Sequence, residues 1–175
     1  HRLGLTLSQK AVPDETNEIG VALELLRGLI LEGKLITVDA LLTQKKLAEA
    51  ILAQRGHYLM AVKENQAEVL GWIRSVLDEP EWFCEASDEA ETTDTGHGRI
   101  EHRRLVSSSA LSDSGLWPGM KQVFKIERSV IKKKSGAERQ GVVYGVTSLS
   151  RGQARAEQLL KMSRGHWQIE NKSHW

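Results

Sequence analysis

The chain has 175 residues, 40% of them hydrophobic and 27% charged, and its formal net charge is +1. These values are ordinary for a globular protein, and the length suffices for one domain with a hydrophobic core and a small insertion. No apolar run reaches the roughly 18–20 residues that span a membrane, no secretory signal opens the chain, and the single cysteine, Cys84, excludes an internal disulfide. We therefore expect a cytoplasmic protein.

The balanced total hides an uneven distribution of charge along the chain. Residues 78–94 hold eight acids and no Lys or Arg, whereas residues 99–164 hold 14 Lys and Arg against five acids. Such segregation can attract a polyanion to one face of a protein. Charged loops that are merely hydrated give the same pattern, so the distribution alone leaves both interpretations open.

The first part of the chain alternates predicted strands and helices. Leucines at every second position predict a strand within residues 2–12, and residues 18–33 have the periodicity of a helix that ends at Gly33. Residues 34–40, KLITVDA, form a short apolar run that is typical of a strand covered on both faces.

The same order then repeats. Thr43 is the predicted start of a second amphipathic helix that ends at Gly56, residues 57–63 indicate another buried strand, and residues 65–79 predict a third helix. The order β-α-β-α-β-α predicts an α/β fold in which neighbouring strands run parallel and are joined by right-handed crossovers.

Beyond residue 80 the pattern changes to that of an antiparallel β meander. Turn-rich stretches such as DTGHG (94–98) and KSGA (134–137) separate segments rich in β-branched residues. The predicted strands are residues 99–108, 120–134 and 138–150. A last helix is predicted from about residue 153 to the end of the chain.

Asp39 is the first candidate site residue, because it ends an apolar strand with a carboxylate. An ionised carboxylate is costly to bury unless it is paired, hydrogen-bonded or bound to a metal. Asp39 could cap the following helix, but Ala40, Leu41 and Leu42 intervene before Thr43, which is the better cap. Sites in open α/β sheets gather at the carboxyl ends of strands, where we expect Asp39 to lie.

The last helix carries a second candidate group in the motif HWQIEN. His166 and Glu170 are four residues apart and therefore share one face of the helix, with His174 a further turn on. A His/Glu pair at this spacing is most often a surface ion pair, so the spacing alone does not establish catalysis.

Two more stretches have a composition that suits phosphate binding. TGHGRIEHRR (95–104) combines glycines, a histidine and arginines, which bind phosphates through two parallel hydrogen bonds; an ordinary hairpin turn with exposed charges fits it equally well. Lys63 follows the second buried strand and is expected near Asp39. The ENQ sequence after it also fits a helix-capping loop.

Taken together, six stretches resemble the DDE-type transposases of bacterial insertion sequences, in particular the group of H-repeat-associated proteins. No single stretch is specific, but their order and spacing are, and they span almost the whole chain. They are NEI (17–19), ITVDALLTQKKLAEAILAQRGHYLMAVKENQ (36–66), HGRIEHRR (97–104), LWPGMKQV (116–123), GVTSLS (145–150) and RGHWQIENKSHW (164–175).

The resemblance implies an RNase H-like core, a mixed sheet with helices, with a β-rich insertion before the C-terminal helix. The implied core is residues 1–80, with its first strand missing, and the insertion is residues 81–150. Residues 151–175 would be a C-terminal catalytic helix that returns to the core.

In this family three carboxylates bind two divalent metal ions, Mg²⁺ or Mn²⁺. The second carboxylate matches Asp39 and the last matches Glu170, so the resemblance makes these two residues metal ligands and catalytic residues. Many relatives carry Tyr where this chain has Ser163 and Arg where it has His166, and their Lys would fall just past Trp175. His166 is therefore a catalytic candidate that is expected to contact phosphate.

The implied partner is double-stranded DNA, at the ends of the insertion sequence and at the target, and the implied active complex is a homodimer associated with the nucleoid. The reaction would be metal-dependent cleavage of phosphodiester bonds followed by strand transfer. The residues expected to contact DNA are Lys63, His97, Arg99, Arg103, Arg104, Lys121, Arg164, Trp167 and Asn171.

The family's first aspartate would lie on a strand upstream of this sequence. The acids before Asp39 all fall in a predicted turn or helix, and the sequence does not begin with methionine. We therefore expect a fragment of the catalytic domain that is inactive by itself. The alternatives are an inactive transposase remnant that at most binds DNA and, less favoured, another RNase H-like nuclease.

Overall fold

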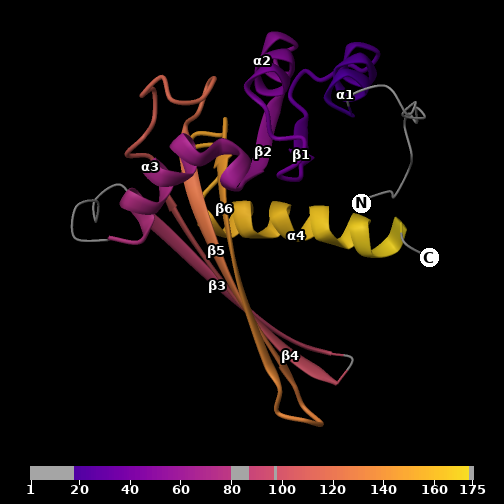
Figure 1. Cartoon of the computed structure of the whole chain (residues 1–175), viewed down its shortest axis with the longest axis vertical. Helices are drawn as coiled ribbons and strands as arrows, with labels where there is room; N and C mark the ends of the chain where they lie inside the picture. Colours follow the sequence, from indigo (N-terminus) through magenta and orange to yellow (C-terminus); the bar gives the residue numbers. More distant parts are fainter. Residues whose placement is uncertain (1–17, 80–86, 97, 174–175) are drawn as a thin grey trace.

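The computed structural model describes residues 18–79, 87–96 and 98–173, with side chains from residue 19 to residue 165. The strands of this part form one mixed sheet in the order β1-β2-β6-β5-β4-β3, and helices cover both of its faces (Figure 1). The α/β class predicted from the sequence is confirmed. The strand predicted within residues 2–12, His97 and His174 lie outside the described residues.

The element bounds follow the order of the chain. The strands are β1 (Leu35–Val38), β2 (His57–Val62), β3 (Ser87–Gly96), β4 (Arg99–Ser108), β5 (Gln122–Lys132) and β6 (Glu138–Thr147). The helices are α1 (Glu18–Arg27), α2 (Lys45–Ala53), the 3₁₀ turn η1 (Glu64–Gln66), α3 (Ala67–Leu77) and α4 (Ala156–Ser173). Among the described residues no helix is both long and apolar enough to cross a membrane.

The first two strands run parallel, as the β-α-β order predicts, and Val38 of β1 pairs with Met60 of β2. The other strand pairs are antiparallel, and β6 lies directly beside β2, with Met60 opposite Val146. The meander is therefore continuous with the parallel pair. The predicted strand at residues 99–108 is confirmed with the same bounds.

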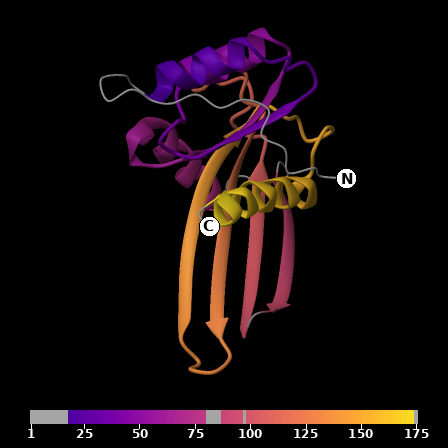
Figure 2. The ribbon, with the colours of Figure 1, turned by 90° about the vertical axis from the view of Figure 1, so that its right-hand side faces the viewer.

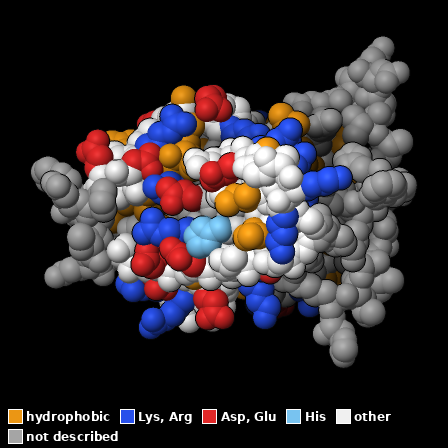
Figure 3. All heavy atoms as spheres, turned by 90° about the horizontal axis from the view of Figure 1, so that it is seen from below, with side chains coloured by type: hydrophobic (Ala, Val, Ile, Leu, Met, Phe, Trp, Pro, Cys, Tyr) orange, Lys and Arg blue, Asp and Glu red, His pale blue; other side chains and the backbone are white. Residues whose placement is uncertain are grey.

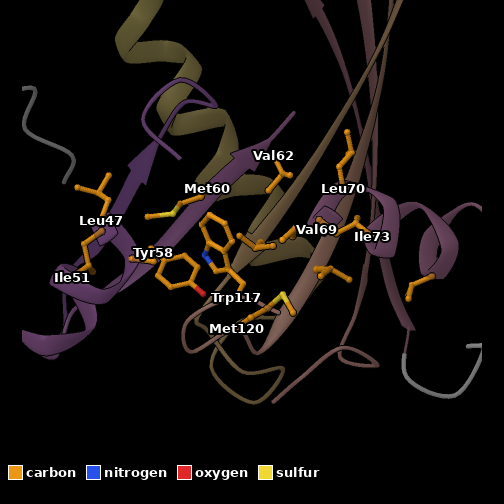
Figure 4. Close-up of a cluster of buried hydrophobic side chains, with 14 of the residues drawn as sticks. Leu47, Ile51, Tyr58, Met60, Val62, Val69, Leu70, Ile73, Trp117 and Met120 are labelled. Atoms are coloured by element: carbon orange, nitrogen blue, oxygen red, sulfur yellow. The ribbon is translucent and has the colours of Figure 1, made fainter. Parts of the chain in front are cut away.

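The two faces of the sheet carry separate hydrophobic cores. On one face, side chains from α1, α2, α3 and the loop before β5 pack against Tyr58 and Met60 of β2 (Figure 4). Trp117 and Met120 of that loop are almost fully buried, and the Tyr58 hydroxyl donates to the Pro118 carbonyl oxygen at 2.7 Å. On the other face, Leu159 and Leu160 of α4 pack against residues of β2, β4 and β5.

Strands β3 to β6 extend well beyond the helices and form a long four-stranded arm (Figures 1 and 2). Each has 10 or 11 residues, whereas β1 and β2 have 4 and 6. The arm ends in two turns, one between β3 and β4 and one between β5 and β6. The Lys133 amide donates to the Gly98 carbonyl oxygen at 2.8 Å, so the two turns are joined.

Three predicted helix boundaries are wrong. One is the end of the second helix, because α2 ends at Ala53 and not at Gly56. The first helix ends at Arg27, and Gly33 instead has φ +66 in the turn before β1. Thr43 does not begin α2, which starts at Lys45 after an extended Gln44. The Thr43 side chain is buried and its hydroxyl donates to the Asp39 carbonyl oxygen at 2.9 Å, so it braces the loop instead of capping the helix.

Strand β3 was not predicted, because its sequence SDEAETTDTG is rich in residues that are rare in strands. It forms at the edge of the sheet by pairing along its whole length with β4. Cross-strand ion pairs compensate for the poor propensity: Arg104 contacts Glu89 at 2.6 Å and Glu91 at 3.4 Å. Predicting this strand from sequence requires knowing that the basic strand β4 is its neighbour.

We predict that Gly145→Ala destabilises the protein by about 1–3 kcal/mol, because the added methyl would overpack the junction of β2, β5 and β6. A Cβ at Gly145 would lie 2.6 Å from the Met60 carbonyl oxygen and closer still to the Phe124 ring. The matched control is Gly141→Ala in the same strand, where a Cβ meets nothing within 4 Å. Urea unfolding measures both; equal stability of the two variants would contradict the packing argument.

Candidate active site

Asp39 lies directly after β1 and organises the loop that leads to α2. Its Oδ1 accepts hydrogen bonds from the amides of Leu41 at 2.9 Å and Leu42 at 3.4 Å, and its backbone oxygen accepts the bond from Thr43. Asp39 therefore closes a tight turn and does not cap α2. Its side chain is half-buried, and within the described part of the chain Oδ2 has no hydrogen-bond partner.

The loop after β2 holds the loop after β1 in place. The Asn65 side-chain amide donates to the Ala40 carbonyl oxygen at 2.8 Å, and the Gln66 amide donates to that of Thr43 at 3.1 Å. Lys63, the last residue before this loop, is exposed. The expectation that Lys63 lies at the same sheet edge as Asp39 is confirmed, because the two loops are hydrogen-bonded to each other.

Sequence reasoning missed the role of Asn65 and Gln66. The sequence ENQ fits a capping loop, but neither side-chain amide caps α3. The available signal was the position of two amides directly after a buried strand whose parallel neighbour ends on an acid. Such amides can satisfy backbone carbonyls that the end of a sheet leaves unpaired.

Helix α4 crosses the face of the sheet that α1, α2 and α3 leave uncovered (Figure 2), and it approaches the carboxyl end of β1, where Asp39 lies. It starts beside β3, where the Ala156 amide donates to an Asp88 carboxylate oxygen at 3.1 Å. Further along, Ser163 lines a small apolar cavity together with Thr37 and Val38, the residues that precede Asp39. The fold thus brings together two segments that are more than 100 residues apart in sequence.

Glu170 lies on α4 seven residues after Ser163, about 10 Å further along the helix axis at 1.5 Å per residue. The motif HWQIEN lies within α4, so its backbone is helical, as predicted. The side chains of His166, Trp167, Glu170 and Asn171 lie outside the described residues. Within the part whose side chains are described, no group of three His, Cys, Asp or Glu residues could hold a metal ion.

A cluster of ion pairs lies on the arm beneath α4. The guanidinium of Arg103 contacts Glu101 at 2.6 Å and Asp94 at 3.2 Å, and Arg164 of α4 contacts the same Asp94 at 2.6 Å. Arg128 of β5 also pairs with Glu101. Burial lowers the pKa of Arg103, and the neighbouring Glu101 opposes that shift. The cluster fastens α4 to β3, β4 and β5.

Several residues expected to contact DNA are already engaged in such pairs. Arg103 and Arg164 belong to the cluster beneath α4, Arg104 pairs with acids on the opposite face of the arm, and Lys121 contacts Asp113 at 2.6 Å. Arg99 and Lys63 are exposed and have no ion pair in the described part. His97 lies outside it. A DNA-binding role for these residues stays a prediction.

Comparison with known proteins shows the family of the chain. A model of the transposase DDE domain matches residues 1–175. The chain belongs to the transposase DDE-domain family. It is 32% identical to "Putative protein YbfL" and to "H repeat-associated putative transposase YhhI", both of Escherichia coli K12, over 98% of its own length. It is 30% identical to "Putative transposase YncI" of Escherichia coli O157:H7.

This DDE-domain chain spans about half the length of the relatives it matches. The alignments cover 46% of YbfL and YhhI and 45% of YncI, in each case with 98% of this chain. The resemblance to the H-repeat-associated group, drawn from six short stretches, is thereby confirmed.

We predict that Glu101→Gln destabilises this DDE domain by about 3 kcal/mol, because it leaves the buried Arg103 without its nearest counter-charge. Glu101 is only 6% exposed. The matched control is Glu89→Gln, which removes an exposed partner of Arg104 and should cost less than about 1 kcal/mol. The measurement is the free energy of unfolding in urea. A loss at Glu101 no greater than at Glu89 would show that the cluster is not structural.

Proposed function

We propose that this chain forms part of the catalytic domain of a DNA transposase and supplies two of its three metal-binding carboxylates, Asp39 and Glu170. The observation that carries the proposal is the approach of α4 to the carboxyl end of β1, in a chain of the transposase DDE-domain family. That approach is needed to bring the two acids to one site, although they are 131 positions apart in sequence.

We further propose that the fold is RNase H-like and has three parts. Residues 1–80 would be the core, residues 81–150 an insertion and residues 151–175 the catalytic helix. The parallel pair β1–β2 with α4 across the sheet supports this division. The length of the arm supports it as well, because β3 to β6 project beyond the helices that cover the core.

The environment of Asp39 fits a divalent metal ligand. Two backbone amides and the brace from Thr43 fix the carboxylate, while its Oδ2 has no partner among the described residues. Carboxylate oxygens are suitable ligands for Mg²⁺ and Mn²⁺. Bound ions would supply activation of a water or a DNA 3′-hydroxyl and stabilisation of the leaving oxygen.

The protein's own residues would position the acids and the DNA. The amides of Asn65 and Gln66 hold the loop that carries Asp39, and the ion pair of Arg164 with Asp94 fixes the helix that carries Glu170. His166 and Lys63 are the proposed phosphate contacts beside these acids. The substrate would be double-stranded DNA at insertion-sequence ends, cut and joined to a target by a homodimer.

A catalytically inactive remnant that at most binds DNA is the second candidate. One observation favours it: of the acids before Asp39 that the structure describes, Glu18 and Glu24 lie on α1 and Glu32 pairs with Arg55 in the following turn. None of them lies on a strand beside β1. An acid on a strand that precedes β1 would have to lie outside the described residues.

We predict that the complete product of the gene that encodes this chain nicks supercoiled plasmid in the presence of Mn²⁺. Asp39→Asn and Glu170→Gln should abolish nicking, because each removes one of the proposed ligands. The matched control is Glu157→Gln, an exposed acid at the start of the same helix, which should leave nicking unchanged. An inert gene product would favour the remnant, and nicking that survives Asp39→Asn would refute the site.

We predict that the 175-residue chain by itself does not nick DNA and binds Mg²⁺ or Mn²⁺ only weakly. Two carboxylates leave most of an octahedral metal shell to water, so the site gains little over a free hydrated ion. Isothermal titration with Mn²⁺ and the same plasmid assay measure this. Tight binding of Mn²⁺ that Asp39→Asn does not weaken would point to a metal site elsewhere.

A further inference from the structure

The free end of the arm carries five cations that have no ion pair within the described residues. They are Arg99, Lys132, Lys133, Lys134 and Arg139, and all five are exposed. Most basic residues elsewhere on the arm are paired with acids, as in the cluster beneath α4. Basic and acidic side chains are both visible in the view of this end (Figure 3). What sets these five cations apart from the other basic residues of the arm is therefore the lack of an ion pair, not the local abundance of positive charge.

Three of these cations share one face of the sheet. Arg99 of β4 lies directly opposite Lys132 of β5, and Arg139 of β6 lies opposite Val130, two residues away. Like charges directly opposite each other destabilise a strand pair unless an anion neutralises them. The acid nearest to Arg139 in sequence is Glu138, which accepts hydrogen bonds from Ser129 and Gln140 on the opposite face. The acid nearest to Arg99 is Glu101, which lies on the same face but is paired with Arg103 and Arg128.

The shared face is the one that α4 covers. Side chains alternate between faces along a strand, and Arg99 is six positions from Leu105, which packs beneath α4. Lys132 is likewise six positions from Ile126 of the same core. Arg99, Lys132 and Arg139 therefore lie on the same face of the sheet as α4. They are at the free end of the arm, whereas α4 crosses the other end.

The strand register gives the spacing between the two places. Val38 pairs with Met60, Met60 with Val146, and Val146 with Val123 of β5. Lys132 lies nine residues beyond Val123, which corresponds to about 30 Å along the strands at roughly 3.3 Å per residue. Strand β5 is three strand spacings from β1, about 14 Å across the sheet, so the separation is about 33 Å. One turn of B-DNA measures about 34–36 Å. A duplex that reaches Asp39 would therefore present its backbone to the end of the arm after about one turn.

We propose that the end of the arm is a separate DNA-binding surface that holds the phosphate backbone about one helical turn from Asp39. This rests on the proposed function, which makes duplex DNA the partner. The contacts would be sequence-independent, because they involve Lys and Arg on the backbone and release counterions. The joined turns, linked by the bond from Lys133 to Gly98, present the five cations as one unit.

The test is the affinity of the 175-residue chain for a 30-bp duplex, measured by fluorescence anisotropy in EDTA between 50 and 200 mM salt. In the arm variant all five cations become Gln: Arg99, Lys132, Lys133, Lys134 and Arg139. The control variant changes the same number of Arg and Lys residues to Gln elsewhere on the surface. Its residues are Arg27, Lys34, Lys45, Lys46 and Arg155, which are exposed and lie outside the proposed site.

We expect the arm variant to bind at least about tenfold more weakly at 100 mM salt, with the slope of log K against log salt reduced by about 0.9 for each lost phosphate contact. The control variant, with the same change in net charge, should retain most of the affinity. Unaltered binding by the arm variant, an equal loss in the control, or no binding by the original chain would each overturn the proposal.

The binding assay contains no metal and measures no cleavage, so it separates this proposal from the proposed catalytic function. Loss of binding in the arm variant, together with an inert gene product, would support a DNA-binding arm on a remnant. Nicking that depends on Asp39 but is unaffected by the arm variant at limiting DNA would count against the arm. Urea unfolding of both variants confirms that they fold as the original chain does.

Discussion

The pairing of β2 with β6 is the interaction on which the rest of the structure depends. It places the last strand of the meander beside the parallel pair, with Met60 opposite Val146. The junction is tightly built: the Thr147 hydroxyl donates to the Tyr58 carbonyl oxygen at 2.7 Å, and the Tyr58 amide donates to the Ser148 hydroxyl at 3.0 Å. Gly145 is required there because no side chain fits between Phe124 and the β2 backbone.

This junction determines where α4 lies and in which direction the arm projects. Because β6 leads into α4, the helix starts at the far edge of the sheet and crosses toward β1, where Ser163 meets the residues before Asp39. Because the meander strands are about twice as long as β1 and β2, their turns project away from the helices. One continuous sheet therefore carries the candidate active site at its β1 edge and the exposed cations at the free end of the arm.

Charge on this protein has two roles that composition does not separate. Arg103, Arg104 and Arg164 form ion pairs that hold β3 and α4 in place, whereas Lys132 to Lys134 have no acidic partner in the described part of the chain. Removing the carboxylate beside the buried Arg103 costs more stability than removing one partner of an exposed pair, because it leaves a buried charge uncompensated. An exposed lysine without an acid keeps its charge available for a phosphate.

The sequence by itself determined the local elements: the apolar runs at β1 and β2, the parallel order and the strand at residues 99–108, because these depend on periodicity within a few residues. It also identified Asp39 as exceptional, since an apolar strand that ends on an acid is costly without a partner. Only the tertiary structure decided that the acidic residues 87–96 form a strand, that Asn65 and Gln66 brace the Asp39 loop, and that Arg103, Arg104 and Arg164 are paired with acids. Those outcomes depend on neighbours distant in sequence, whose register and ion pairs exist only after β2, β6 and α4 have come together.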